Sequence, residues 1–555
     1  MGDSPAPAAD DLNTVAAEVL NRIVSGANAR PAISERTSDK ISVVALLNAV
    51  VERARASRSA KLLKPLADRL VAGYPNSPTV LRLYADVFAA ELPADRLLVL
   101  RQRCVSLSPH DTLAIRQLAE LHFQQNNLDA AIRTIEAAEN AALYEEFLQF
   151  KLGYYYALKG EHEPAVRMYM NALRKQVTQR TCMNLASSLR HLGRYEESAA
   201  FSKRAMLMQP QDSGVYYNYG NLERERGDTA GASKLFRHAE CLDPQNYSIT
   251  WNYSQSLMAE GDFARGFEKY KDRWYFKEFP TRIRYPSITN VTDLAAVTGR
   301  LFVYCEQGRG DNILFARFLK HLTQAVPDHV DLTVECFPDL LPLFQRSFPS
   351  LRFVPYTLTL PEGYDYYFPL FDIARVVGAF DVSAVDFPYL IAPSDGRRHL
   401  PDTGRPKIGL VWAGNPDFVH DKHRSARIDD IAPLFEDQGL SYFALQKGVD
   451  EGQIEARYPG THDLSGELKD FDDTAWLMSQ MDLIISSCTS TANLAGALGK
   501  RGLVITGHVR DWRWMTGPRS DWYPSLRIVQ KPRTQPWRDF FHLVRDEIRK
   551  EADSL

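Results

Sequence analysis

A turn with two glycines and a carboxylate follows the first β-rich run of the C-terminal half. The segment reads Glu306-Gln-Gly-Arg-Gly-Asp311 and leads into an apolar helical pattern. Gly308 and Gly310 let backbone N–H groups approach a ligand, and a helix N-terminus favours an anion or a polar sugar. The alternative is a tight strand-to-helix turn in which Asp311 only caps the helix. The motif alone leaves both interpretations open.

A second turn, rich in hydroxyl groups, follows the apolar run MDLIISS at 481–487 and opens a helix of small residues. Its hydroxyl side chains belong to Ser487, Thr489, Ser490 and Thr491. Together with the exposed amides of the helix they form a phosphate site that needs no net positive charge. Helix capping explains one of these hydroxyls well but four of them poorly. The turn therefore favours phosphate binding.

Basic residues follow two further β-rich runs. Lys447 comes directly after LSYFALQ (440–446), and Arg424 lies in a basic stretch, 415–427, that follows KIGLVWAG (407–414). The carboxyl edge of a parallel sheet is where ligands bind, and cations there can neutralise a leaving phosphate. Lys447 is either such a partner or a solvated loop charge. His420 and His423 lack a third ligand, so no metal site is predicted.

A repeat of 34 residues organises the N-terminal half. Gly193, Gly227 and Gly261 follow one another at this step, as do Pro210 and Pro244. The pattern predicts a helix, a turn, a second helix and a proline that stops it, the signature of a tetratricopeptide repeat. One helix pair cannot bury its apolar face alone, so neighbours must stack. We expect six to seven units between residues 45 and 280, after a flexible tail at 1–36.

Short β-rich runs alternate with helical ones after Trp274. They lie at 300–306, 331–337, 351–355, 364–370, 407–414, 440–446, 481–487 and 502–507. Strands that alternate with helices predict two parallel-sheet units of Rossmann type, joined by a linker at 393–405, with a ligand site in the cleft between them. A tryptophan cluster, Trp512, Trp514 and Trp522, is interpreted as packing between a domain and its closing helix rather than as a base-stacking surface.

Three asparagines share the repeat step. Asn184, Asn218 and Asn252 fall on the first helix of each unit, the helix that lines the inner surface of such a superhelix. An amide side chain donates and accepts, so a row of them can pair with the backbone of an extended peptide. The alternative, that asparagine is simply common at this position, stays open.

Composition excludes several classes of protein. The 555 residues are 45% hydrophobic and 24% charged, as in soluble globular chains, and a net charge of -3 gives no global field to gather nucleic acid or anionic lipid. Six cysteines form no CxxC pair, which predicts reduced and mostly buried thiols. The N-terminus lacks a secretory pattern and no apolar run is long enough to span a bilayer. We expect a cytoplasmic protein.

These motifs together resemble the tetratricopeptide-repeat proteins that end in a glycosyltransferase domain related to bacterial heptosyltransferases. The plan is similar to the protein O-GlcNAc transferases and to bacterial flagellin O-glycosyltransferases. The matching motifs are EQGRGDNILFARFL, GLVWAGNPDFVHDKHRS, FALQKG, DLIISSCTSTANLAGALGK and DWRWM with WYPSLRIVQKP. The resemblance implies an α-helical superhelix (37–280) followed by an α/β GT-B fold, with an N-terminal Rossmann-like domain (281–400) and a C-terminal nucleotide-sugar-binding domain (401–555).

The resemblance also implies roles for residues. Asp311 matches the proposed base of an inverting, metal-independent reaction, and Lys447 matches a lysine that stabilises departing phosphate. Relatives usually have Asp-Thr and a histidine where this chain has Cys488-Thr489 and Asn493. This departure disfavours ADP-heptose and favours another nucleotide sugar, such as a CMP-activated nonulosonic acid like pseudaminic acid. No separate cofactor is implied.

The predicted function is therefore transfer of a sugar to Ser or Thr of a polypeptide held by the repeats, with flagellin as the first acceptor to test. In this interpretation Asp311 is the base, Lys447 and the turn from Ser487 to Asn493 hold the donor phosphate, and Arg424 assists. Two alternatives remain. The first is a glycosyltransferase acting on lipopolysaccharide or another glycan, although a small glycan needs no long peptide-binding surface. The second is a repeat scaffold whose C-terminal domain has lost catalysis, an interpretation kept open by Cys488 and Asn493.

Overall fold

The computed structural model describes Asp68 and residues 71–138, 145–277, 293–357, 361–394, 399–418 and 421–554. The chain divides into two compact units, 1–209 and 210–555. The predicted tail (1–36) lies outside the described residues. So do residues 37–67, 69 and 70 of the predicted superhelix. The two units are considered separately below.

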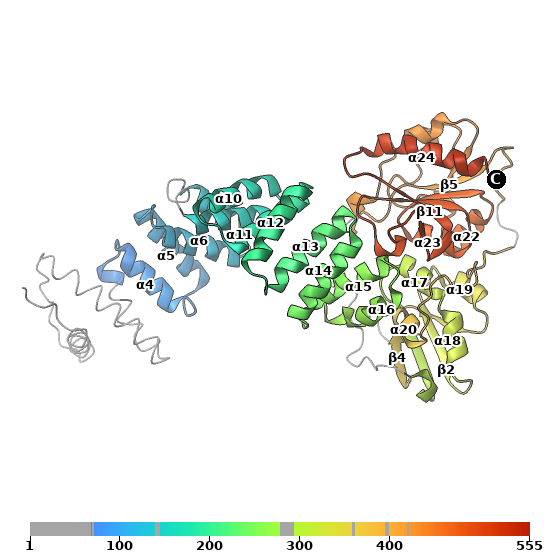
Figure 1. Cartoon of the computed structure of the whole chain (residues 1–555), viewed down its shortest axis with the longest axis horizontal. Coiled ribbons are helices and arrows are strands. Elements are labelled where there is room, and N and C mark those ends of the chain that lie inside the picture. Colours follow the sequence, from blue (N-terminus) through green and yellow to red (C-terminus); the bar gives the residue numbers. More distant parts are fainter. Residues whose placement is uncertain are drawn as a thin grey trace, which may run out of the picture. The chain divides into compact units, whose positions relative to one another are not determined.

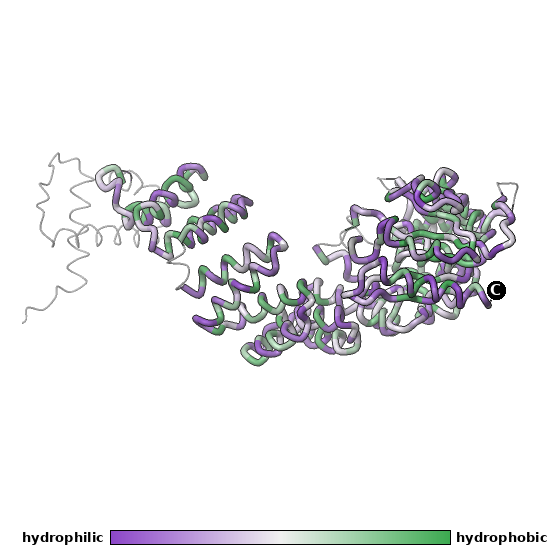
Figure 2. Tube along the Cα trace, turned by 90° about the horizontal axis from the view of Figure 1, so that it is seen from above, coloured by the Kyte–Doolittle hydropathy of each residue, from purple (hydrophilic) through white to green (hydrophobic). Residues whose placement is uncertain are grey.

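Pairs of antiparallel helices make up the described part of the first unit (Figure 1). They are α4 (Pro78–Phe88), α5 (Ala94–Leu107), α6 (Thr112–Gln124), α7 (Leu128–Glu136), α9 (Glu146–Leu158), α10 (His162–Lys175), α11 (Gln179–His191) and α12 (Tyr195–Met208). Side chains of Ser77, Asp111 and Thr178 accept hydrogen bonds from the first turns of α4, α6 and α11. Purple and green alternate along these helices in Figure 2, as expected for helices that bury one face.

The second unit begins with two more helix pairs, α13 (Ser213–Arg226), α14 (Thr229–Leu242), α15 (Tyr247–Ala259) and α16 (Phe263–Tyr270), and the 3-10 turn η1 (Lys271–Tyr275). Gly227 ends α13 with a φ of 88°, which only glycine adopts readily. A Cβ at Gly220 would lie 2.6 Å from the Phe236 ring, so the small residue permits the close crossing of α13 and α14. The predicted repeat is confirmed for six helix pairs within the described residues.

A four-stranded sheet follows, built from β1 (Arg300–Tyr304), β2 (Asp331–Cys336), β3 (Arg352–Pro355) and β4 (Tyr366–Pro369) in the order β3-β2-β1-β4. All three pairings are parallel, as predicted. Its helical segments are η2 (Leu294–Ala296), α17 (Arg309–Ala316), α18 (Leu319–Ala325), α19 (Leu341–Ser347), η3 (Leu370–Asp372) and α20 (Ile373–Val376). The β1 side chains from Leu301 to Tyr304 are all buried, which explains the near-continuous apolar run.

A seven-stranded sheet completes the second unit, in the order β10-β11-β9-β8-β5-β6-β7. Its strands are β5 (Lys407–Val411), β6 (Ser441–Ala444), β7 (His462–Asp463), β8 (Leu483–Ser487), β9 (Gly502–Thr506), β10 (Arg519–Ser520) and β11 (Tyr523–Gln530). Its helical segments are η4 (Asp421–His423), η5 (Ala432–Glu436), α21 (Ile454–Arg457), η6 (Ser465–Glu467), α22 (Phe471–Ser479), α23 (Ser490–Ala497), η7 (Trp512–Trp514) and α24 (Trp537–Ala552). Only β10 pairs antiparallel. The sequence did not predict β7, β10 or β11.

The tryptophan cluster is buried, so its interpretation as packing is confirmed, but its partners differ from those expected. The Trp522 ring lies 5.2 Å from Phe263 and 6.3 Å from Phe267 on α16, and 6.0 Å from Phe315 on α17. The last repeat, the first sheet and one face of the second sheet thus share a hydrophobic core. The closing helix α24 covers the other face of the second sheet, in a separate cluster.

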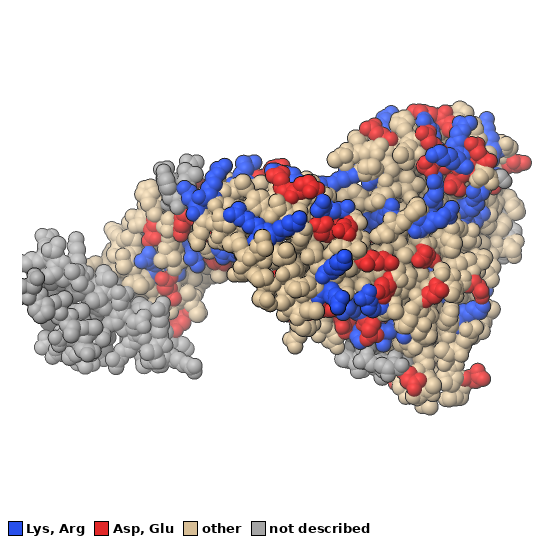
Figure 3. All heavy atoms as spheres, viewed as in Figure 1, with Lys and Arg blue, Asp and Glu red and all other residues tan. Residues whose placement is uncertain are grey.

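The surface and the thiols agree with the composition. On the face drawn in Figure 3, acidic and basic side chains are interspersed. Four cysteines are buried, Cys488 is half-buried and Cys241 is exposed, which confirms the prediction of mostly buried thiols. Among the described residues, no helix has the length and apolar sequence to cross a bilayer.

Candidate functional site

The glycine-rich turn joins the end of β1 to α17. Asp311 is the third residue of α17, and its Oδ2 accepts a hydrogen bond from the Gly308 N–H at 3.2 Å. Asn312 Nδ2 donates to the Glu306 carbonyl at 2.9 Å and to the Gly308 carbonyl at 2.7 Å. Gln307 takes a φ of 59°, an uncommon conformation for a residue with a side chain. The side chains of Asp311 and Asn312 therefore hold the turn, and Asp311 does cap the helix.

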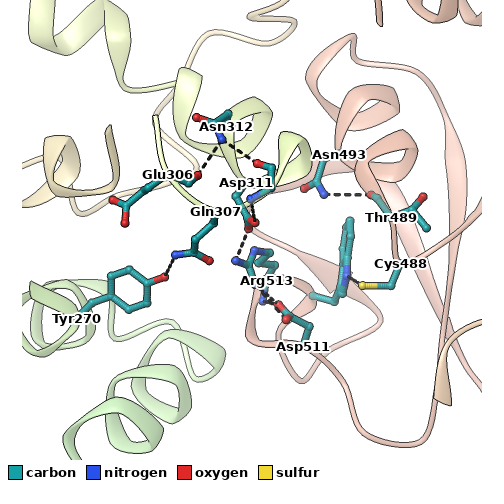
Figure 4. Close-up of polar contacts among 12 residues, drawn as sticks. Tyr270, Glu306, Gln307, Asp311, Asn312, Cys488, Thr489, Asn493, Asp511 and Arg513 are labelled. Carbon is teal, nitrogen blue, oxygen red and sulfur yellow. Dashed lines mark hydrogen bonds and ion pairs between the residues drawn. The ribbon is translucent and has the colours of Figure 1, made fainter. Parts of the chain in front are cut away.

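Asp311 also forms an ion pair with Arg513 (Figure 4). Arg513 Nη1 binds Asp511 as well, at 2.8 Å and 3.0 Å from its two carboxylate oxygens. Burial lowers the pKa of Arg513, whereas the negative charges of Asp311 and Asp511 raise it. The two charges together outweigh burial, so the pKa lies above its ordinary value. Because Asp311 lies on α17 and Arg513 on η7, this pair connects the two sheet-bearing parts of the second unit.

The hydroxyl-rich turn joins the end of β8 to α23. Thr489 occupies the N-cap position, yet its side chain makes no capping hydrogen bond and instead lies 3.2 Å from the Ser486 hydroxyl. Ser487 Oγ is buried and has no hydrogen-bond partner within the described residues. Thr489, Ser490 and Thr491 are half-buried at the start of the helix. Helix capping thus does not explain the cluster. The hydroxyl groups of the turn and the backbone amides of the first turn of α23 can instead bind an anion.

The first turns of α17 and α23 touch. A Cβ at Gly310 would lie 3.1 Å from Ser490 Cα and 3.0 Å from Asn493 Nδ2. Asn493 is buried, donates to the Thr489 carbonyl at 3.1 Å and accepts from the Tyr523 hydroxyl at 3.0 Å. Since each helix begins at the carboxyl end of a strand, this contact brings the carboxyl edges of the two sheets together. Gly310 serves this close approach, and its predicted role in donor binding stays a prediction.

Arg424 lies at the hydroxyl-rich turn. Its Nη1 donates to the Cys488 carbonyl at 2.8 Å and its Nε to Asp421 Oδ1 at 2.9 Å. The side chain is 22% exposed, so its guanidinium is fixed but reachable. Arg424 is therefore positioned beside the amides of α23, as a phosphate-binding cation requires.

Lys447 is arranged differently. Its ammonium forms an ion pair with Glu451 at 2.7 Å, donates to the Ser465 carbonyl at 3.1 Å and is 56% exposed. Among the described residues, no hydrogen bond or ion pair joins Lys447 to Arg424 or to the turn at 487–493. The structure thus brings Arg424 to the turn but does not bring Lys447 into contact with it.

Residues missed by the sequence analysis extend the same sheet edge. His508 follows β9, Lys531 follows β11, and the His508 ring lies 5.6 Å from that of His423. Burial, together with the charges of His423, Arg533 and Lys531, lowers the pKa of His508 to about 4. Position directly after a predicted strand was the available signal for His508. Lys531 and Arg533, which lie close enough to His508 to lower its pKa, add positive charge to this edge.

Cys488 lies in the hydroxyl-rich turn, directly before Thr489. Trp514 Nε1 donates to its Sγ at 2.7 Å. Burial raises the pKa of the thiol to about 11, an effect that Asp511 reinforces and Arg424 opposes. The thiol is therefore protonated at neutral pH and acts as a packing group next to Arg424.

The asparagines of the repeats differ in exposure. Asn184, in the first unit, is half-buried and donates to the Arg180 carbonyl at 2.9 Å. Asn218, in the second unit, is also half-buried. Asn252 is buried, accepts from Arg224 at 2.7 Å and donates to Tyr217 at 3.0 Å. Asn252 already satisfies its polar groups inside the helical array, and a peptide would have to displace these partners.

A buried ion triad joins the last repeat to the glycine-rich turn. Arg273 of η1 binds Glu306 at 2.6 Å and 2.9 Å and Asp372 at 2.8 Å, with no exposure of the Arg273 and Glu306 side chains. Burial raises the pKa of Glu306 to about 7, although Arg273 opposes the shift. Tyr270 accepts a hydrogen bond from Gln307 Nε2 at 2.6 Å (Figure 4). The last repeat thereby holds the turn that precedes Asp311.

No group of three or more metal-ligating side chains occurs among the described residues. His420, one of the two histidines considered above, lies outside them, and so does the side chain of Lys422. The site as described is built from hydroxyls, backbone amides, cations and the carboxylates of Asp311, Asp421 and Asp511.

Comparisons with known proteins support the repeats. A family model for the tetratricopeptide repeat matches residues 179–212. Over 440 residues the chain is 25% identical to Protein FlbA of Caulobacter vibrioides (strain ATCC 19089 / CIP 103742 / CB 15), and the match covers 67% of this chain and 73% of FlbA. The match covers 67% of the 555 residues, which is a longer stretch than the 280 residues that precede the predicted first sheet domain. The similarity therefore extends beyond the repeats.

Solved structures that match part of the chain include repeat proteins. YrrB, described as a TPR protein with an unusual peptide-binding site, is 13% identical and covers 33% of this chain and 94% of its own, with a TM-score of 0.30. The type IV pilus biogenesis factor PilW is 13% identical over 36% and 94% of the two chains, with a TM-score of 0.32. The Cut9-Hcn1 hetero-tetramer of the APC/C is 16% identical over 45% and 46%, with a TM-score of 0.33. The chain thus contains tetratricopeptide repeats, followed by a part with parallel and mixed sheets, and is distantly similar to FlbA.

Proposed function

We propose that the chain is a cytoplasmic protein O-glycosyltransferase with a GT-B arrangement of its two sheet-bearing parts. It transfers a sugar from a nucleotide donor, of which a CMP-activated nonulosonic acid is the first candidate, to Ser or Thr of a polypeptide recruited by the repeats. Flagellin is the first acceptor to test. The donor and acceptor classes rest on the family resemblance, and the site geometry supplies the physical support.

The observation that supports this function most is the contact between the first turns of α17 and α23. It places Asp311 next to a turn that offers hydroxyls, backbone amides and Arg424. A carboxylate and an anion-binding turn side by side are the two groups that a sugar transfer from phosphate requires.

The reaction follows from these groups. The acceptor hydroxyl attacks the anomeric carbon of the donor, and the bond from that carbon to the phosphate oxygen breaks. Asp311 takes the proton of the hydroxyl, while Arg424 and the amides of α23 stabilise the negative charge on the leaving phosphate. Attack from the face opposite the phosphate inverts the anomeric centre.

The Asp311–Arg513 ion pair bears on this mechanism. The carboxylate of Asp311 already binds Arg513 and the Gly308 N–H, so its oxygens are occupied, and we propose that substrate binding separates it from Arg513. Asp311→Asn should abolish sugar transfer while acceptor binding by the repeats persists. Arg513→Met is the matched control, since it breaks the same ion pair and keeps the carboxylate. Transfer by Asp311→Asn at the wild-type rate would remove Asp311 from the mechanism.

The same ion pair also favours a second candidate function. In a scaffold that has lost catalysis, Asp311 does not have to accept a proton from a substrate. Its carboxylate can then remain permanently paired with Arg513. Calorimetry with a panel of nucleotides and sugar nucleotides separates the candidates. Binding without turnover on any acceptor would support the scaffold, and binding with turnover would support the enzyme.

A further inference from the structure

Basic side chains gather at the carboxyl ends of β9 and β11. His508 is the second residue after β9, Lys531 follows β11 directly, and Arg533 lies two residues further along the chain. His423 ends η4, in the segment between β5 and β6, and its ring lies 5.6 Å from the His508 ring. We refer to His423, His508, Lys531 and Arg533 as the basic cluster.

Backbone contacts fix the position of the basic cluster. The Lys531 N–H donates to the Thr506 carbonyl at 2.9 Å, and Gln530 Nε2 donates to the His508 carbonyl at 2.7 Å. A Cβ at Gly507 would lie 2.0 Å from the His423 carbonyl oxygen, so a glycine is needed for this close approach. The cluster is therefore built into the sheet edge by three separate segments of the chain.

The charges that act on the cluster are positive. Burial lowers the pKa of His508, and His423, Arg533 and Lys531 lower it further, to about 4. Burial also lowers the pKa of Lys531, whose Nζ donates to the Pro532 carbonyl at 3.1 Å. Within the part of the chain that the structure describes, no carboxylate forms an ion pair with His508 or Lys531. These cations are therefore gathered without a counterion of their own.

Acidic residues on the neighbouring segments already bind other cations. Asp421, two residues before His423, accepts from Arg424 Nε at 2.9 Å. Asp511, three residues after His508, accepts from Arg513 at 2.8 Å. Arg510, in the same loop as His508, donates to the Met515 and Gly517 carbonyls and adds a further positive charge. The local excess of positive charge is typical of a site that binds an anion.

The basic cluster is reachable and lies next to the hydroxyl-rich turn. His423 is exposed, and His508, Lys531 and Arg533 are half-buried. His423 directly precedes Arg424, whose Nη1 donates to the Cys488 carbonyl in that turn. A ligand that occupies both the turn and the cluster therefore needs two negatively charged groups.

We infer that the basic cluster binds a second negatively charged group of the sugar-nucleotide donor, beside the phosphate held at the hydroxyl-rich turn. The inference rests on the proposed function for the identity of the ligand as a donor. The same chemistry has two possible sources, the carboxylate of an acid sugar and a second phosphate, and the experiment below distinguishes them.

Binding of such a group should be coupled to proton uptake. An anion next to His508 stabilises its imidazolium form, which the neighbouring cations disfavour. If the anion offsets burial and these cations, the pKa of His508 returns to its ordinary value of 6.5. The free protein is then unprotonated at His508 at pH 6.5, whereas half of the complex is protonated. The expected uptake is about half a proton per ligand at pH 6.5 and close to none at pH 8.5.

Isothermal titration calorimetry of the full-length protein measures this uptake. CMP-N-acetylneuraminic acid carries a phosphate and a carboxylate, UDP-N-acetylglucosamine carries two phosphates, and the methyl ester of CMP carries a single phosphate. None of these ligands has a group that titrates near pH 6.5. Each is titrated in MES and in Bis-Tris, because the difference in heat between two buffers gives the number of protons bound.

We expect proton uptake with at least one of the two ligands that carry two negative groups, and none with the methyl ester. Uptake with CMP-N-acetylneuraminic acid assigns the cluster to a sugar carboxylate, and uptake with UDP-N-acetylglucosamine assigns it to a second phosphate. Equal uptake with the methyl ester would contradict a second site, because that ligand has only the phosphate that the turn holds.

Variants assign the proton to the cluster. His508→Gln should abolish the uptake and weaken the same ligand about three- to tenfold, as for the loss of one hydrogen bond, and leave the affinity for the methyl ester unchanged. Lys531→Met should weaken that ligand to a similar extent. His542→Gln is the matched control, since it removes a half-exposed imidazole from α24 and should retain wild-type uptake. Undiminished uptake in His508→Gln would overturn the inference.

The remaining outcomes separate the inference from the proposed function. Proton-linked binding without sugar transfer to any acceptor would support the basic cluster and refute the proposed function. Sugar transfer from a donor that binds without proton uptake would leave the proposed function standing and overturn the inference. Binding of neither two-anion ligand would also overturn it.

Discussion

Replacing Arg273 by methionine should destabilise the second unit by about 3–5 kcal/mol at pH 8. Arg273 and Glu306 are fully buried and joined by two hydrogen bonds, so the substitution leaves the Glu306 carboxylate buried without its counterion. Asp372 is less affected, because Arg375 lies 3.7 Å from its second oxygen. The free-energy loss thus comes mainly from Glu306.

The loss should depend on pH in a defined direction. Burial raises the pKa of Glu306 to about 7 from an ordinary value of 4.5, so the folded protein binds a proton that the unfolded chain releases between these values. The contribution of this group to stability therefore falls as pH rises through that window. Without Arg273, the neutral carboxyl is favoured still more, so destabilisation should be smaller at pH 5.5 than at pH 8.

Equilibrium unfolding in urea, followed by tryptophan fluorescence, measures this effect. All eight tryptophans lie between Trp251 and Trp537, so the signal reports on the second unit alone. The double variant Arg273→Met, Glu306→Gln should recover much of the loss, because a neutral amide needs no counterion. A loss below about 1 kcal/mol at pH 8, or an equal loss at both pH values, would refute the reasoning that a buried charge is left unpaired.

Three further predictions follow from burial and packing. A fragment of residues 210–555 should fold cooperatively, whereas a fragment of residues 281–555 should aggregate in size-exclusion chromatography, because it lacks α16 and η1, which complete the shared core. Iodoacetamide should modify the exposed Cys241 rapidly and Cys488 slowly under native conditions, since burial raises the pKa of Cys488 to about 11; equal rates by peptide mass spectrometry would contradict this. The pKa of His508 is lowered to about 4, so wild-type stability should fall between pH 6.5 and 4 as the unfolded chain takes up a proton, and His508→Gln should show a shallower decline in thermal unfolding.

Local patterns allowed much of the fold to be predicted. The 34-residue step gave the helix pairs because each pair repeats the same glycine, small-residue and proline positions. The eight β-rich runs each contain a strand, since buried parallel strands are near-continuous apolar segments. In contrast, β11 was missed because its residues were interpreted only as part of the tryptophan cluster.

Long-range pairings were not predictable in the same way. Arg513 lies 202 residues from Asp311, and Arg273 lies 33 and 99 residues from its two carboxylate partners. Nothing in the local sequence around Asp311 distinguishes a free carboxylate from one that binds a distant arginine. The glycine-rich turn was therefore located correctly, while its electrostatic environment required the structure.

The proposed function is tested most directly by the intact mass of flagellin. Purified protein is incubated with unmodified flagellin monomers and a sugar nucleotide, with CMP-activated nonulosonic acid tested first. The account predicts that the flagellin mass increases by whole multiples of one sugar residue, only when both donor and protein are present, and that Asp311→Asn gives no increase. Donor consumption or donor binding with an unchanged flagellin mass would contradict it.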